Sequence, residues 1–181
     1  WSGNYVLGRM AVTSGIDPFT VSFFRWSLAC LFILPFAWRS LRQDYPILRR
    51  HWPFLVLLGW LGVCNYNLLL YVGLTSTSVT NAVLLNSLMP IMILLTARVI
   101  LGNKTSLLQN LGIVVSTLGA LEIVSRGHFQ HLLSLTVSVG DLWILVAAVS
   151  WALYSVLIIK RPEGLSILGL FASTSLIGTS I

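Results

Sequence analysis

A run of 23 residues without a charge, from Trp52 to Leu74, is the feature that most constrains this chain. An α-helix rises 1.5 Å per residue, so about 20 apolar residues cross the roughly 30 Å of hydrocarbon in a bilayer. Membrane-barrel strands instead alternate strictly over about 10 residues, and the sequence has no such alternation. The runs that fit a spanning helix are Trp1 to Ser14, Phe19 to Trp38, Trp52 to Leu74, Val79 to Leu101, Leu107 to Val124, Asp141 to Ile159 and Leu165 to Ile181. We therefore predict an all-α, polytopic transmembrane helix bundle with about seven helices here, the first and last of them incomplete.

Charged residues make up only 9% of the sequence, against about 25% in an ordinary soluble domain. So few charges cannot cover a surface that faces water. The formal net charge is +6, but no basic stripe with interleaved aromatic residues accompanies it. We therefore expect the partner to be the lipid bilayer and not nucleic acid. Cys30 and Cys64 both lie in apolar runs, which is typical of buried thiols and not of a disulfide framework or metal site.

The distribution of Lys and Arg predicts the orientation, because basic residues in short loops resist translocation. Only Arg126 lies in the loops at the opposite side, and Arg9 and Arg25 lie inside predicted helices. The basic side should therefore be cytoplasmic. The eight basic residues on that side are Arg39, Arg42, Arg49, Arg50, Arg98, Lys104, Lys160 and Arg161.

An internal repeat of opposite orientation is indicated by two short segments. Trp1 to Leu7 aligns with Trp151 to Leu157, with identities at the Trp, Val and Leu positions. Five predicted helices separate the two segments, and a duplicated unit with an odd number of helices must be inverted in the membrane. We expect the chain to be part of a longer protein of roughly 300 residues, with ten helices in two inverted five-helix repeats and a site between them.

Several motifs occur in order: WSGNYVLGR at 1–9, FRW at 24–26 after Pro18, YVGL at 71–74, TNA at 80–82, Pro90, GDL at 140–142 and SWALY at 150–154. Together they resemble the EamA-type transporters of the drug/metabolite transporter superfamily. The resemblance implies a first repeat at 1–125, an extracytoplasmic loop at 126–139 and the start of a second repeat at 140–181. It also implies cytoplasmic termini, a central cavity lined mainly by the first four helices of each repeat, and a location in the cytoplasmic (inner) membrane of a bacterium. A homodimer is compatible with these features.

Arg9 and Arg25 are the sharpest candidates for substrate binding, because a charge inside a span costs several kcal/mol and usually has a function. Each lies eight residues from Asp17, so both should lie about 9 to 12 Å below the outer face on neighbouring antiparallel helices. We expect Arg25 in particular to attract a carboxylate or phosphate of the substrate. The alternative is structural, in which both arginines reach the outer headgroups or pair with Asp17 and backbone carbonyls.

Amide side chains within the spans are further candidates, because each needs a hydrogen-bond partner where water is absent. They line a polar cavity or, equally well, join neighbouring helices. Pro90 lies four residues after Asn86, so it frees a backbone carbonyl and predicts either a polar pocket or a bend near the middle of the membrane. The amides are Asn4, Asn65, Asn67, Asn81 and Asn86; those kept as substrate-binding candidates are Asn4, Asn81 and Asn86.

The aromatic residues Tyr66, Trp151 and Tyr154 could clamp a substrate, although packing is the more common use of such residues. Small residues at helical spacing predict close helix packing. These small residues are Gly59, Gly62, Gly112, Ser116 and Gly119.

Acidic residues are few, and most have a simple local interpretation. Glu122 is the only intramembrane candidate for proton coupling, although a surface i,i+4 pair with Arg126 is the favoured interpretation. Asp141 should cap the sixth helix, and Asp44 and Glu163 fall in predicted basic loops without a special role.

No enzyme chemistry and no cofactor are indicated. All three histidines lie in loops, and His128 with His131 would make a poor metal site. The sequence also lacks a phosphate-binding Gly-Lys loop and an acidic cluster for Mg²⁺.

These features predict a secondary transporter that moves a small metabolite by alternating access, in the export direction by family analogy. Arginines in the first helices favour an amino acid or a related zwitterionic or anionic solute. The alternatives are a drug or cation exporter of the same family, a seven-helix membrane receptor, and a membrane-embedded enzyme or lipid-handling protein.

Overall fold

The computed structural model describes residues 2–102, 106–125 and 138–181, and all regular elements in these ranges are helical. The predicted all-α fold is therefore confirmed. Trp1, Lys104, Arg126, His128 and His131 lie outside the described residues. The helices are α1 (Ser2–Thr13), α2 (Pro18–Arg50), α3 (Trp52–Gly59), α4 (Tyr66–Ser76), α5 (Val79–Asn86), α6 (Met89–Leu101), α7 (Leu107–Ser125), α9 (Val139–Leu157) and α10 (Ile167–Ser180), with a π-helical segment η1 (Trp60–Asn65) and a short 3-10 turn η2 (Ile158–Lys160).

Most spans predicted from hydropathy correspond to these helices, with α2 as the exception because it extends past its predicted end. Four helical stretches in the described residues are long and apolar enough to cross a membrane: Pro18–Arg50, Trp52–Ser76, Val79–Leu101 and Val139–Lys160. The shorter apolar helices Leu107–Gly119 and Ile167–Ser180 accompany them. The chain is therefore an integral membrane protein. The predicted second repeat and its inversion stay predictions.

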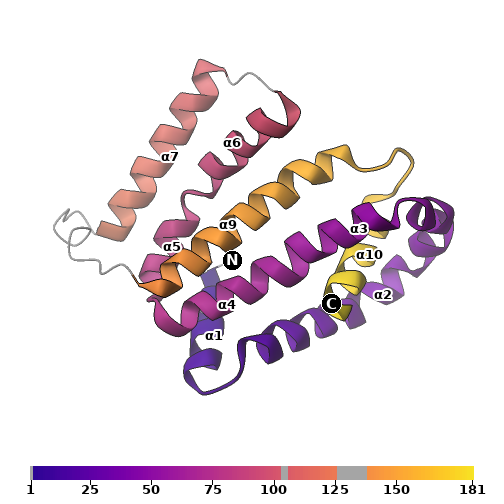
Figure 1. Ribbon diagram of the computed structural model, residues 1–181, viewed down its shortest axis with the longest axis horizontal. Helices are drawn as coiled ribbons and strands as arrows, with labels where there is room; N and C mark the ends of the chain where they lie inside the picture. Colours follow the sequence, from indigo (N-terminus) through magenta and orange to yellow (C-terminus); the bar gives the residue numbers. More distant parts are fainter. Residues whose placement is uncertain (1, 103–105, 126–137) are drawn as a thin grey trace.

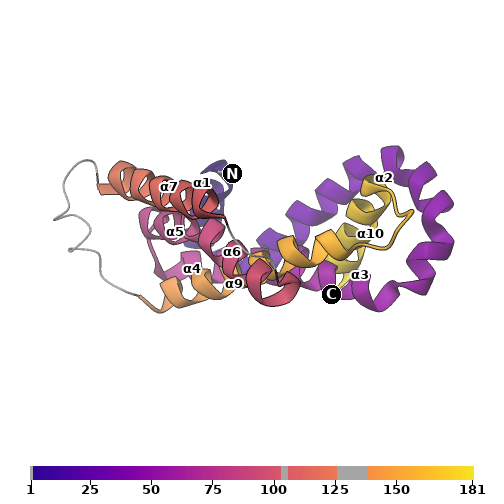
Figure 2. The ribbon, with the colours of Figure 1, turned by 90° about the horizontal axis from the view of Figure 1, so that it is seen from above.

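Helix α9 connects the two ends of the bundle (Figures 1 and 2). It packs against α4 and α6, whereas α10 packs against α2 and α3, and α1 packs against α4 and α5. The chain segment from α3 through η1 to α4 touches most of these elements. One hydrophobic cluster surrounds Leu55 and Leu58 at its start, and another surrounds Leu70 and Leu74 at its end. The π-helical segment η1 lies between them.

Capping signals place the helix starts as the sequence predicted. Asp17 precedes Pro18 and accepts hydrogen bonds from the backbone N–H groups of Phe19 (2.9 Å) and Thr20 (3.2 Å). Asp141 also caps its helix, but α9 begins two residues earlier than expected. Ser138 is the N-cap residue, and the Asp141 carboxylate accepts from its backbone N–H at 2.7 Å.

Helix α2 contradicts the predicted loop at 39–50, because it remains helical through Arg50. Ile47 and Leu48 pack against the cluster around Leu55 and Leu58, so this basic segment gains tertiary contacts that its sequence alone does not reveal. The interpretation of Asp44 as a loop residue without a role was also wrong. Asp44 is buried and accepts hydrogen bonds from the backbone N–H (3.1 Å) and hydroxyl (2.6 Å) of Ser166.

The bend predicted at Pro90 is confirmed. The apolar run from Val79 to Leu101 is divided into α5 and α6, and Ser87 and Leu88 form a turn between them. Pro90 has no N–H to donate to the carbonyl of Asn86, so the helical ladder is interrupted at this point. The turn is closed by tighter bonds, such as that from the Leu88 N–H to the Leu85 carbonyl at 3.1 Å.

Glycines permit the closest helix crossings. A Cβ atom on Gly73 would lie 2.6 Å from Cγ1 of Ile144 and 2.8 Å from the carbonyl oxygen of Gly140, so α4 and α9 touch backbone to backbone there. Gly59 meets α10 and Gly62 meets the ring of Tyr154, as their predicted packing function requires. By contrast, a Cβ atom on Gly112 or Gly119 would have no heavy atom of another described residue within 4 Å outside its own helix backbone and chain neighbours.

Candidate functional site

Arg25 is the centre of a polar network between α1, α2 and α4. Its Nη1 donates to Oδ1 of Asn67 and, at 3.1 Å, to the hydroxyl of Tyr71. The Tyr71 hydroxyl in turn donates to Oδ1 of Asn4 at 2.7 Å. Two predicted candidates, Asn4 and Arg25, are thereby brought together on neighbouring helices. An arginine at this depth is costly unless polar groups replace its water shell, and these neutral side chains do so.

The π-helical segment orients Asn67. Its Nδ2 donates to the backbone carbonyls of Val63 (3.0 Å) and Gly62 (3.4 Å), both of which belong to η1. Because the amide group uses its nitrogen on these carbonyls, its oxygen is the atom left to accept from Arg25. Asn67 is only 2% exposed, so its amide group is fixed inside the bundle, whereas Arg25 is an exposed residue that reaches it from α2. Single π-helical turns often mark functional positions in helices.

Arg9 has different partners from Arg25. Its Nη1 donates to the carbonyl oxygen of Leu74, in the last turns of α4. A cation there satisfies a carbonyl and interacts favourably with the negative end of the helix dipole. This contact corresponds to the structural alternative for Arg9, in which the arginine pairs with a backbone carbonyl.

Three predicted aromatic residues form one stack between α4 and α9. The ring centroids of Tyr66 and Trp151 are 4.7 Å apart, and those of Trp151 and Tyr154 are 5.2 Å apart. Tyr154 lies against Gly62, whose missing side chain makes room for the ring. The stack therefore starts from the same π-helical segment that holds Asn67.

Asn65 joins helices, as the second interpretation of the amides proposed. Its Nδ2 donates to the hydroxyl of Ser150 at 3.0 Å, and that hydroxyl donates to the carbonyl of Leu61 at 2.9 Å. The carbonyls of η1 are thus taken up by side chains from two sides, Ser150 on α9 and Asn67 on α4.

The remaining two amide candidates lie on α5. The backbone N–H of Asn81 donates to the hydroxyl of Ser78 at 3.1 Å in the first turn, and Asn86 is the last residue of the helix. Near this first turn the buried Asp141 accepts from the hydroxyl of Thr77 and joins α9 to the end of α4.

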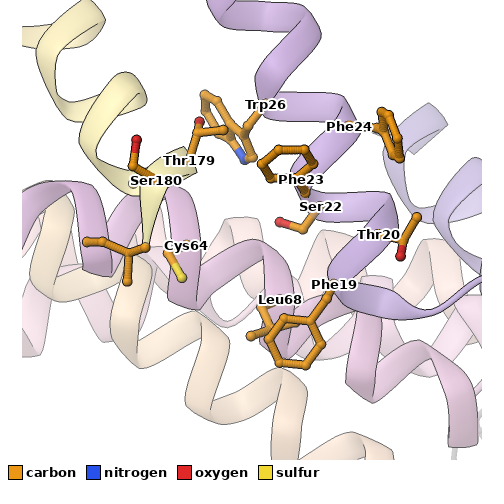
Figure 3. Close-up of a pocket in the computed structure, with 12 residues that line it drawn as sticks. Phe19, Thr20, Ser22, Phe23, Phe24, Trp26, Cys64, Leu68, Thr179 and Ser180 are labelled. Carbon is orange, nitrogen blue, oxygen red and sulfur yellow. The ribbon is translucent and has the colours of Figure 1, made fainter.

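A cavity of about 450 Å³ opens beside the Arg25 network, where α2, η1, α4 and α10 meet. Figure 3 shows Thr179 of α10 next to Trp26 and, further down, Leu68 of α4 beside Phe19. The α2 residues Ser22 and Trp26, on either side of Arg25 in the sequence, line this space. The aromatic residues are Phe19, Phe23, Phe24 and Trp26.

Sequence reasoning missed Tyr71, Ser150 and this cavity. Tyr71 stands within a family motif, but nothing local distinguishes it from a packing tyrosine. Asn67 is an intramembrane amide that was not among the substrate-binding candidates, although an amide within an apolar span is itself a signal that it needs a partner. The cavity joins α2, η1 and α4 to the end of α10, which lies more than 100 residues further along the chain than Leu68, so no local pattern could reveal its lining.

The fold and the network define a multi-pass α-helical membrane protein with an arginine held between its spans. The chain belongs to the EamA-like transporter family, whose family model matches residues 1–125. This confirms the resemblance found in the sequence motifs.

Two curated relatives are similar over parts of the chain. An uncharacterized transporter of Bacillus subtilis strain 168, YyaM, is 36% identical over 110 residues, which are 61% of this chain and 36% of that protein. An uncharacterized transporter of Methanothermobacter thermautotrophicus is 26% identical over 156 residues, which are 80% of this chain and 46% of that protein. The chain therefore covers less than half the length of either relative. No solved structure matches it.

Proposed function

We propose that the full-length protein is a secondary transporter that exports a small zwitterionic or anionic metabolite, such as an amino acid, by alternating access. Membership in the EamA-like transporter family supports the transporter class. The export direction and the location in a bacterial cytoplasmic membrane rest on family analogy. A substrate path between the two halves would lie near η1, where side chains of α4 and α9 meet.

The contacts of Arg25 are the main support for the proposed substrate class. Its hydrogen-bond partners among the described residues are Asn67 and Tyr71, both neutral, so its charge is not cancelled by them. Both bonds are made by Nη1, and the guanidinium carbon lies 5.5 Å from the ring centroid of Trp26, a residue that lines the neighbouring cavity. In a low-dielectric site such a group attracts a carboxylate strongly and in a defined orientation.

The neighbouring cavity supports a small substrate. Its volume of about 450 Å³ and its walls, which combine aromatic side chains with a few hydroxyl groups, are typical of sites that bind compact organic molecules. Proton coupling belongs to the same proposal, with Glu122 on the exposed face of α7 as its candidate among the described residues. The alternative to proton coupling is facilitated diffusion. We also propose that the full-length protein forms a homodimer.

The test is uptake by the full-length protein in proteoliposomes, with and without a pH gradient. The substrate panel contains amino acids, organic anions and cationic dyes. We expect saturable flux of an amino acid or anion, and we expect Arg25→Gln to reduce it by more than about tenfold because a charge-assisted hydrogen bond is lost. Arg25→Lys keeps the charge but not the planar fork and should retain part of the flux.

Arg98→Gln is the matched control, because Arg98 lies in the last turn of α6, away from the Arg25 network, and its loss removes the same charge. It should leave uptake unchanged. Selective movement of cationic dyes would replace the proposed substrate class with drug export. Absence of flux for every compound would contradict the transporter itself and favour a receptor or an enzyme.

A further inference from the structure

The C-terminal part of α2 extends past the thickness of a bilayer. The helix has 33 residues and is therefore about 50 Å long, whereas about 20 residues cross the hydrocarbon. Counted from Pro18, this places Trp38 at the level of the lipid headgroups and leaves Arg39 to Arg50 beyond it. Figure 2 shows this last part of α2 turning across the end of the bundle before it meets α3. Pro46 lies within the turning segment and removes a helical hydrogen bond there.

One face of this segment carries alternating aromatic and basic side chains. Trp38, Arg42, Tyr45 and Arg49 follow the spacing i, i+4, i+7 and i+11, so they share a face of the helix; we call this face the α2 stripe. All four residues are exposed, with Trp38 and Tyr45 each at 60%. Two large aromatic rings left this open to water would be unfavourable, whereas the bilayer interface accommodates them well.

The charged residues at 39–50 also favour a position at the membrane surface. Asp44 is its only acidic residue, and it is turned away from the α2 stripe, buried against Ser166 at the start of α10. The guanidinium carbon of Arg42 lies 5.9 Å from the ring centroid of Trp38, so the arginine stacks along the aromatic ring and presents its N–H groups beside it. Trp38, Leu41, Arg42 and Tyr45 together line a hollow of about 410 Å³.

We propose that the α2 stripe is a binding site for the headgroup of an anionic phospholipid in the leaflet at the Lys/Arg-rich end of the bundle. Arg42 and Arg49 bind the phosphate, because a guanidinium fork matches phosphate geometry. Trp38 and Tyr45 anchor the segment at the boundary between headgroups and acyl chains. The site is independent of substrate transport and holds this end of α2 on the membrane surface.

The test uses two double variants of the full-length protein that remove equal charge from the same segment. R42Q/R49Q removes the arginines of the α2 stripe, and R39Q/R50Q removes the two on the adjacent face. Native mass spectrometry in detergent measures binding of dioleoyl-phosphatidylglycerol against dioleoyl-phosphatidylcholine. We expect the unmodified protein to prefer the anionic lipid. R42Q/R49Q should weaken its binding roughly 10- to 30-fold, since each basic residue near a headgroup contributes about fivefold.

R39Q/R50Q should weaken the same binding by less than about threefold. Raising the ammonium acetate concentration should also weaken binding of the anionic lipid to the unmodified protein, because salt screens charges near the surface. This second measurement needs no variant and therefore does not depend on the folding of R42Q/R49Q.

Three results would overturn the proposal: no preference for the anionic lipid, equal losses in both double variants, or binding that salt does not change. Another occupant can be recognised directly. If another part of the protein covers the α2 stripe, a maleimide will fail to label the Tyr45→Cys variant in lipid-free detergent, in a Cys30→Ser and Cys64→Ser background. That result would also exclude the lipid site.

Discussion

Asn67 on α4 accepts a hydrogen bond from the guanidinium group of Arg25 on α2, while its own amide nitrogen binds two carbonyls of the π-helical segment. The distortion of one helix is therefore linked to the orientation of a cation on another. A side chain that could not satisfy both sets of groups would leave buried polar atoms unpaired.

Replacement of Asn67 should destabilise the protein. Asn67→Leu is similar in size but removes the amide that binds the Val63 carbonyl and one of the two hydrogen-bond acceptors of Arg25. We expect a loss of about 1–3 kcal/mol, seen as a lower melting temperature of the full-length protein in detergent. Asn110→Leu, at an exposed position on α7, is the control and should change the melting temperature little. Equal melting temperatures for both variants would contradict the positioning of Arg25 by Asn67.

The crossing of α4 and α9 should not tolerate a methyl group at Gly73. Gly73→Ala places a Cβ within 2.6 Å of Ile144 and against the backbone of Gly140. Overpacking of this kind costs about 1–3 kcal/mol. Gly112→Ala makes the same change in an open part of α7 and should be neutral or slightly stabilising, because alanine favours a helix. Thermal unfolding of both variants measures the difference, and a stable Gly73→Ala protein would exclude this close crossing.

Asp44 should stabilise the start of α10 from the end of α2. Asp44→Ala removes the acceptor for the backbone N–H and hydroxyl of Ser166, at an expected cost of about 1.5–3 kcal/mol for hydrogen bonds to a charged group. Asp44→Asn keeps an oxygen acceptor and should lose less. Chemical or thermal unfolding can compare them with Glu163→Ala, which changes an exposed residue in the loop before α10. If Glu163→Ala lowers the free energy of unfolding as much as Asp44→Ala does, the contact between Asp44 and Ser166 does not specifically stabilise the protein.

Arg9 and Arg25 should respond differently to loss of charge. Arg9→Gln loses the bond to the Leu74 carbonyl, so we expect the free energy of unfolding to fall by about 1 kcal/mol. A lower melting temperature would show this loss. The substrate concentration for half-maximal uptake should stay within about twofold, because Arg9 is satisfied by the helix end. A large loss of substrate affinity in Arg9→Gln, with unchanged stability, would assign Arg9 to substrate binding instead.

Hydropathy, proline and capping residues determined much of this fold, because they act within a few residues. The apolar runs predicted the helices, Asp17 and Pro18 predicted the start of α2, and Pro90 predicted the division between α5 and α6. Arg25 and Asn4 could also be chosen from the sequence, since a polar group in an apolar span needs a partner wherever the span packs.

The partners themselves were decided by tertiary structure. Asn67 and Tyr71 are 42 and 46 residues from Arg25, and the same apolar runs are compatible with several ways of packing. Asp44 shows the same limit, because its local sequence indicates a basic loop whereas Ser166, 122 residues away, buries it inside a helix contact. Short-range rules therefore place the helices of this protein, and only long-range packing decides which polar groups meet between them.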